Sequence, residues 1–164
     1  MKLNNEYNSV VDDILDNKEF DKIRYIEHHG ITRYEHSIRV SYISYKIAKK
    51  LKLNYIEVAR AGLLHDFFMS EEKRSIKEKL ISMFTHPKVA LCNAEKNFDL
   101  SKREKNIIES HMFPIYKCLP KYKESILVST IDKLVATYEF SFKFRLKFKY
   151  ATNLLILVLF GIFK

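Results

Sequence analysis

Apolar residues recur three and four positions apart along most of the chain, which is the spacing of one face of an α-helix. The pattern predicts helices over residues 8–17, 18–30, 33–51, 55–68, 71–84, 102–111 and 121–138, and a further helix that begins at residue 87. Only three glycines and three prolines occur among 164 residues, which favours long helices over a turn-rich β-sheet. The sequence therefore predicts an all-α protein with a real core.

Local signals predict several of the helix ends. Thr32 and Ser101 are each followed three residues later by a glutamate, which is the capping box of a helix start. Gly30 is expected to end the second helix, because glycine readily takes the left-handed conformation found after helices. Pro87 is expected to be the first residue of a helix, which places His86 at a helix entrance.

Histidine and aspartate side chains interrupt the apolar faces. The clearest case is the pair His65–Asp66, which directly follows two leucines near the end of an apolar helix. Burying such a pair is costly unless something binds it, as a divalent metal ion would. Other imidazoles and a carboxylate fall on apolar helix faces or at helix ends, so the candidate ligands are His36, His65, Asp66, His86, His111 and Asp132. Imidazole together with carboxylate suits iron, manganese, zinc or cobalt.

Each candidate ligand also has an ordinary structural interpretation. A single histidine on an apolar face is often a hydrogen-bonded core residue. Asp132 alone could be exposed, or it could pair with a lysine. His28 and His29 are interpreted as turn residues. On the pattern alone, a metal site and a set of unrelated structural residues are therefore both open.

In combination, these residues resemble the HD-domain superfamily of metal-dependent phosphohydrolases. The resemblance covers residues 20–140 and lies in the segments RYEHSIRV at 33–40, AGLLHD at 61–66 and STIDK at 129–133. It implies an HD-domain-like helical bundle in which one metal ion is held by His36, His65, Asp66 and Asp132. Some members of the superfamily add two histidines for a second ion. His86 and His111 match that pattern, with Asp66 as the bridge between the ions.

The resemblance also implies a function. It implies hydrolysis of a phosphoester or phosphoanhydride, in a nucleotide or another small phosphorylated molecule, by a hydroxide bound between two cations. Asp66 is then the catalytic residue. Arg33 stands one turn before His36, and Lys133 stands beside Asp132. Both are candidates for contacts with the substrate's phosphate, and an ordinary surface charge is the alternative for each.

The residues after the His–Asp pair depart from the superfamily's usual pattern. Phe67, Phe68 and Met69 stand where many members carry a glycine and a basic residue. They make the edge of the site more apolar, which favours a nucleobase or lipid-like group on the substrate, or signals altered chemistry. Some relatives with this ligand set are di-iron oxygenases, so that chemistry is one alternative. A non-catalytic, metal-stabilised module for interaction or membrane recruitment is another.

The pattern changes at Phe140, so the sequence predicts a metal-binding helical domain over residues 1–139 and a separate segment over residues 140–164. Aromatic and basic residues alternate from Phe140 to Tyr150, which is typical of a strand. An uncharged run follows over residues 154–163. As a helix it would be about 15 Å long, half of a bilayer core. We expect this segment to pack on the domain, to form a homo-oligomer contact, or to bind peripherally to a membrane, and nucleic-acid binding ranks below these.

The net charge of +9 is unevenly distributed. The last 25 residues hold five basic side chains and no acidic one, so the preceding residues are nearly balanced. This distribution argues against a general nucleic-acid-binding surface. Cys92 and Cys118 lack the spacing of a metal site, and residues 1–6 have no apolar leader. We therefore expect a cytoplasmic protein with reduced thiols, either free or peripheral to a membrane.

Overall fold

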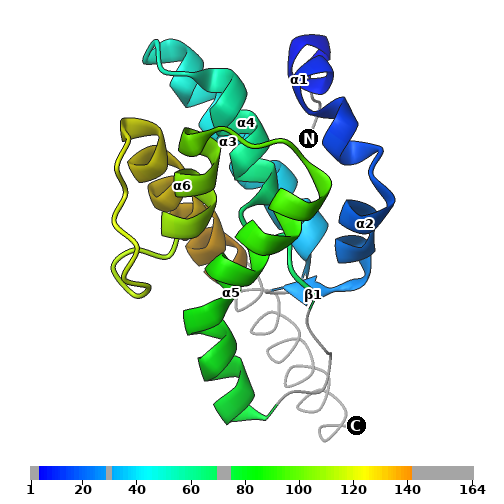
Figure 1. The fold of residues 1–164 in the computed structure, drawn as a ribbon, viewed down its shortest axis with the longest axis vertical. Coiled ribbons are helices and arrows are strands. Elements are labelled where there is room, and N and C mark those ends of the chain that lie inside the picture. Colours follow the sequence, from blue (N-terminus) through cyan, green and yellow to red (C-terminus); the bar gives the residue numbers. More distant parts are fainter. Residues whose placement is uncertain (1–3, 29–30, 70–74, 142–164) are drawn as a thin grey trace, which may run out of the picture.

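The computed structural model describes residues 4–28, 31–69 and 75–141, and these residues form an all-α bundle, as predicted (Figure 1). In chain order the elements are α1 (Asn5–Leu15), α2 (Lys18–Asp21), the 3₁₀-helix η1 (Lys22–Tyr25), β1 (Glu27–His28), β2 (Ile31–Thr32), α3 (Arg33–Lys50), α4 (Tyr55–Leu64), α5 (Ile76–Asn97), α6 (Lys102–Ser110) and a last helix over residues 123–141. Among the described residues, the only sheet is the antiparallel pair of β1 and β2.

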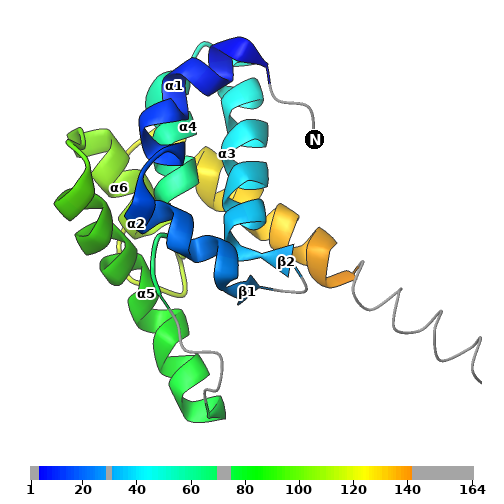
Figure 2. The same cartoon turned by 90° about the vertical axis from the view of Figure 1, so that its right-hand side faces the viewer.

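Helices α3 and α4 form the centre of the bundle (Figures 1 and 2). The predicted capping box starts α3: the Thr32 hydroxyl accepts from the amide of Glu35, whose carboxylate accepts from the Thr32 amide. Gly62 lets the two helices approach closely, because a Cβ there would lie 3.1 Å from the Cα of Ser41. The Ser41 hydroxyl donates to the Ala59 carbonyl across the same contact, at 2.6 Å.

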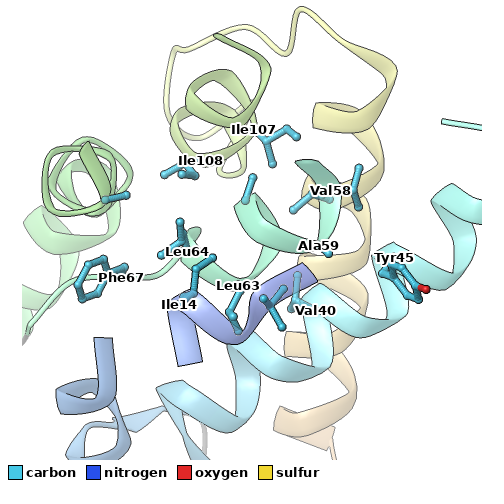
Figure 3. Close-up of a cluster of buried hydrophobic side chains, with 14 of the residues drawn as sticks. Ile14, Val40, Tyr45, Val58, Ala59, Leu63, Leu64, Phe67, Ile107 and Ile108 are labelled. Carbon is cyan, nitrogen blue, oxygen red and sulfur yellow. The ribbon is translucent and has the colours of Figure 1, made fainter. Parts of the chain in front are cut away.

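The hydrophobic core lies between α1, α3, α4 and α6 (Figure 3). Ile14 of α1, Val40 of α3, Leu63 of α4 and Ile107 of α6 are all fully buried there. Apolar burial contributes about 25 cal/mol for each Å² removed from water. This packing therefore fixes how α3, α4 and α6 sit relative to one another, and these are helices that carry candidate ligands.

The second predicted helix is wrong in its C-terminal half. The α-helix stops at Asp21, continues as η1 to Tyr25, and is followed by β1 rather than by helix to Gly30. Glu27 pairs with Thr32 in β2, and Gly30 itself lies outside the described residues. The hairpin leads the chain directly into the capped start of α3, which local helix signals do not reveal. Helix α4 also ends earlier than predicted, at Leu64, with His65 as its C-cap.

The predicted break before Pro87 is also wrong, because α5 runs through this proline as one helix of 22 residues. It starts with a third capping box, in which Ser75 and Glu78 bond each other's backbone amides. His86 therefore lies inside a helix and not at its entrance. Both views show the N-terminal part of α5 projecting away from the bundle (Figures 1 and 2).

The helix over residues 123–141 includes Phe140 and Ser141. The strand predicted from Phe140 is therefore wrong at its first two residues, because they continue the preceding helix. The remainder of the predicted strand and the apolar run lie outside the described residues. Within the part of the chain that the structure describes, no helix is long and apolar enough to cross a membrane.

Candidate metal centre

All six predicted ligands are buried in one cluster, although they come from distant parts of the chain. His36 lies in the first turns of α3, His86 lies within α5, and Asp132 lies on the helix over residues 123–141. His65 and His111 are the C-cap residues of α4 and α6, and Asp66 directly follows the first of these caps. Two helices thus end at the cluster, α3 begins at it, and α5 and the last helix run past it.

Each of the four imidazoles in the cluster has its Nδ1 atom against an acceptor. Three of the acceptors are backbone carbonyls of the same helix: Gly62 for His65 at 2.8 Å, Ile108 for His111 at 2.7 Å, and Ser82 for His86 at 3.0 Å. A carbonyl oxygen only accepts, so each of these Nδ1 atoms carries a hydrogen, and in a neutral ring the Nε2 atom keeps a lone pair. At the two C-caps, the imidazole satisfies a carbonyl near the helix end, where helical donors run out.

When the rings are neutral, the Nε2 atoms of His65, His86 and His111 face the same cluster without a hydrogen between them. Those of His86 and His111 lie 3.0 Å apart, so two lone pairs face each other when both rings are neutral. The Nε2 atom of His65 is buried, makes no hydrogen bond, and lies 3.5 Å from the nearest Asp132 oxygen. Lone pairs that face one another in a buried site cost free energy unless a cation lies between them. The donor set therefore fits a metal ion.

The two carboxylate oxygens of Asp66 face different parts of the cluster. Its Oδ1 atom lies 3.5 Å from the Nε2 atom of His86 and 3.7 Å from that of His111. Its Oδ2 atom lies 4.0 Å from the Nε2 atom of His65. The geometry divides the ligands into overlapping groups: His36, His65 and Asp66; His65, His111 and Asp132; and Asp66, His86 and His111. Asp66 belongs to the first and the last of them, as a bridging ligand would.

His36 is held from both sides by carboxylates. Its Nε2 atom lies 3.0 Å from Oδ1 of Asp132, and its Nδ1 atom lies 2.8 Å from Oε2 of Glu139. Burial opposes the charged form of His36, but the hydrogen bonds to both carboxylates outweigh burial and raise its pKa to about 10. Burial likewise disfavours the charge of Asp132, yet the hydrogen bond from His36 and the nearby His65 imidazole hold the pKa of that carboxyl well below its usual value.

Glu139 is a site residue that the sequence reasoning missed. It is buried, and it also accepts from Nη1 of Arg39 at 3.1 Å. Spacing could have found both residues. Glu139 stands seven positions after Asp132 and Arg39 stands three positions after His36, which are the spacings of residues on one helix face.

The two predicted phosphate contacts differ in their surroundings. Arg33 is buried beside the site, with its Nε atom 3.9 Å from Oδ2 of Asp66. Its Nη1 atom donates to the Phe68 carbonyl at 2.6 Å, and its guanidinium lies over the Phe68 ring. Lys133 donates to the His111 carbonyl at 2.8 Å, and also to the carbonyl and hydroxyl of Ser129. Arg33 thus holds the segment after Asp66, whereas Lys133 ties the end of α6 to the last helix.

The aromatic residues after Asp66 form one wall of the cluster. Phe67 and Phe68 are buried, and Met69 is exposed. The Phe68 ring lies 5.0 Å from the His86 ring, between this imidazole and Arg33. Of the two histidines interpreted as turn residues, His28 lies in β1 and His29 lies outside the described residues.

Comparison with known families shows that the family model of the HD domain matches residues 33–137. This range includes all six candidate ligands and extends from the start of α3 almost to Glu139. No curated protein and no solved structure matches the chain.

Proposed function

Because the chain belongs to the HD-domain family, we propose that it is a metal-dependent phosphohydrolase acting on a nucleotide or another small phosphorylated molecule. In this proposal one ion is held by His36, His65, Asp66 and Asp132, and a second by Asp66, His86 and His111. Divalent cations there would acidify a water molecule for attack on phosphorus and would offset the charge of the phosphate oxygens.

The main support for the proposal is that the two carboxylate oxygens of Asp66 face different imidazoles: Oδ1 faces His86 and His111, and Oδ2 faces His65. A carboxylate that only paired with one histidine would not need an imidazole on each of its oxygens. The Nδ1 contacts support the same interpretation, because in neutral rings they leave the Nε2 atoms free of hydrogen and orient them toward the cluster. Ligand sets held in this way lose little freedom when an ion binds.

The basic residues have separate roles in this proposal. Arg33 places a buried positive charge within 3.9 Å of Asp66, where it offsets charge on a substrate's phosphate. Lys133 fits a positioning role better than a phosphate contact, because its ammonium already donates to two carbonyls and a hydroxyl. Phe68 and Met69 give the substrate an apolar surface beside the charged cluster, which suits a nucleobase better than a bare phosphate.

The test combines metal analysis with turnover. Protein purified without chelator is screened with Mn²⁺, Fe²⁺, Co²⁺ or Zn²⁺ against an aryl phosphate, nucleoside phosphates and a dinucleotide polyphosphate. We expect Asp66→Asn to reduce hydrolysis to background, because the amide is a weaker ligand and carries no charge. Asp13→Asn is the matched control, since Asp13 is an exposed carboxylate that pairs with Arg60 on the surface. It should keep its rate within about twofold.

Other outcomes would support the alternatives. A folded Asp66→Asn protein that keeps the wild-type rate contradicts the proposed site. Substrate-dependent oxygen consumption without phosphate release supports a di-iron oxygenase. Tightly bound metal with no turnover on any substrate supports a non-catalytic, metal-stabilised module.

We also propose that residues 140–164 contact a second copy of the chain or an anionic membrane surface. The support is their composition: five basic residues, no acidic one, and an uncharged run near the end. Basic residues near such a surface contribute about 1 kcal/mol each. Sedimentation and vesicle flotation, with and without residues 151–164, distinguish the two contacts.

A further inference from the structure

Glu139 is a buried carboxylate that contacts the candidate site without belonging to the predicted ligands. Its side chain is 1% exposed, and its two oxygens have separate partners. Oε2 accepts from Nδ1 of His36 at 2.8 Å, and Oε1 accepts from Nη1 of Arg39 at 3.1 Å. Because Asp132 lies two turns earlier on the same helix and reaches Nε2 of His36, one helix holds both nitrogens of this imidazole.

The anchoring of His36 differs from that of the other three imidazoles. His65, His86 and His111 each donate from Nδ1 to a carbonyl of their own helix. Their orientation is therefore set wherever that helix forms. His36 donates to a side chain from another helix, about a hundred residues later in the chain, so its orientation depends on how the last helix packs against α3.

We propose that Glu139 is a positioning residue of the metal site: by accepting the Nδ1 hydrogen of His36, it aims the Nε2 atom at the position of one ion. This inference rests on the proposed function. Arg39 in turn fixes the Glu139 carboxylate, although its own side chain is 39% exposed and lies at the edge of the contact. A carboxylate acceptor also makes the imidazole a more basic ligand than a carbonyl does.

The two halves of the site should therefore respond differently to the loss of Glu139. The half that contains His36 loses the group that orients its imidazole. The half that contains His86 and His111 keeps its backbone anchors. A change at Glu139 should weaken one metal equivalent and leave the other.

The experiment is a titration of metal-free protein with Co²⁺, followed by the visible absorption of the bound ion. Glu139→Ala should bind one of two equivalents about 10–100-fold more weakly, and the band of that equivalent should change. Glu139→Gln should fall between Glu139→Ala and the wild type, because its amide oxygen still accepts the Nδ1 hydrogen but carries no charge. The second equivalent should keep its affinity within about twofold in both variants.

The matched control is Glu124→Gln, on the same helix. Glu124 is also buried, accepts from the Asn54 amide at 3.1 Å and lies 3.7 Å from Arg103, so its loss perturbs the packing of the helix away from the metal site. We expect Glu124→Gln to lower the melting temperature of the metal-free protein and to leave both Co²⁺ affinities unchanged. If Glu139→Ala does not fold, the Co²⁺ affinities of Glu139→Gln and Glu124→Gln are compared to test the proposal.

The inference is overturned if Glu139→Gln and Glu139→Ala bind Co²⁺ as the wild type does, or if Glu124→Gln weakens binding equally. It is also overturned, together with the proposed site, if the wild-type protein binds no Co²⁺. A wild type that binds two ions but hydrolyses no phosphoester contradicts the proposed activity alone, and the titration of the variants still tests Glu139.

Discussion

His36 and His111 lie in the same buried cluster, but the pKa of the first is raised and the pKa of the second is lowered. Burial opposes the charged form of both imidazoles. Two carboxylates outweigh burial at His36 and raise its pKa to about 10. At His111 burial dominates, the charge of His65 adds to it, and the pKa is lowered to about 3. In metal-free protein near pH 7, His36 is therefore an imidazolium and His111 is neutral.

These shifts predict that the metal-free protein loses stability on both sides of pH 6.5. His36 gains a proton more easily in the folded state, so its stabilisation is complete below pH 6.5 and is lost as the pH rises towards 10. His111 resists protonation in the folded state, so its contribution is present above pH 6.5 and is lost as the pH falls towards 3. Urea unfolding in EDTA across this pH range measures the loss of unfolding free energy on the acid side and on the alkaline side.

A substitution at Glu139 separates the contribution of His36 from that of His111. Glu139→Gln removes one of the charges that raise the pKa of His36. It should therefore reduce the loss of stability above pH 6.5 and leave the loss of stability below pH 6.5 unchanged. A metal-free wild type whose unfolding free energy is constant from pH 6.5 to 9 would contradict the assigned charge on His36.

At the scale of the helix, the sequence predicted what is local and missed what depends on distant packing. The capping boxes at Thr32 and Ser101 start α3 and α6 as expected, because their partners lie three residues away. Pro87 was expected to start a helix, since proline inside one costs about 3 kcal/mol. In the fold, His86, Pro87 and Ala90 are buried against the bundle, and this burial keeps α5 continuous.

The same division holds for the candidate site. The six ligands could be found because their residue types interrupt apolar helix faces. The spacing places Glu139 on the same helix face as Asp132, but its contact with His36 depends on the packing of the last helix against α3, which the spacing alone does not give. The pairing of β1 with β2 is likewise a contact of two residues on each strand, too short to leave an alternating pattern.

The close contact of α3 with α4 predicts the effect of Gly62→Val. A Cβ at Gly62 would lie 3.1 Å from the Cα atom of Ser41, so the larger valine side chain must push the helices apart. We expect a loss of about 1–3 kcal/mol in unfolding free energy, and weaker metal binding because the Gly62 carbonyl anchors His65. Chemical denaturation and a Co²⁺ titration measure the two effects.

The control for this substitution is Ile56→Val, on the exposed side of α4. It places the same β-branched residue in the same helix at a position that is 47% exposed, so it should change the unfolding free energy by less than about 0.5 kcal/mol. A Gly62→Val protein as stable as Ile56→Val would show that the two helices can separate without cost.

At the scale of the whole molecule, the candidate site links elements that the chain order keeps apart. The ligands lie on α3, after α4, within α5, after α6 and on the helix over residues 123–141. Hydrophobic packing holds α3, α4 and α6 together (Figure 3). An ion at the cluster would add α5 and the last helix to the same set of bonds, and the metal-free protein must instead hold the facing Nε2 atoms of His86 and His111 together.

Metal binding should therefore stabilise the entire bundle and not one segment of it. A ligand that binds only the folded state at about 100 times its Kd adds about 2.7 kcal/mol, which for a chain of this size raises Tm by about 5–10 °C. We expect EDTA to lower Tm by this amount in one cooperative transition, and Mn²⁺, Zn²⁺ or Co²⁺ to restore it. The double variant His86→Ala, His111→Ala should respond less, because it keeps one of the two proposed positions. Equal Tm values with EDTA and with each metal would contradict a metal site at this cluster.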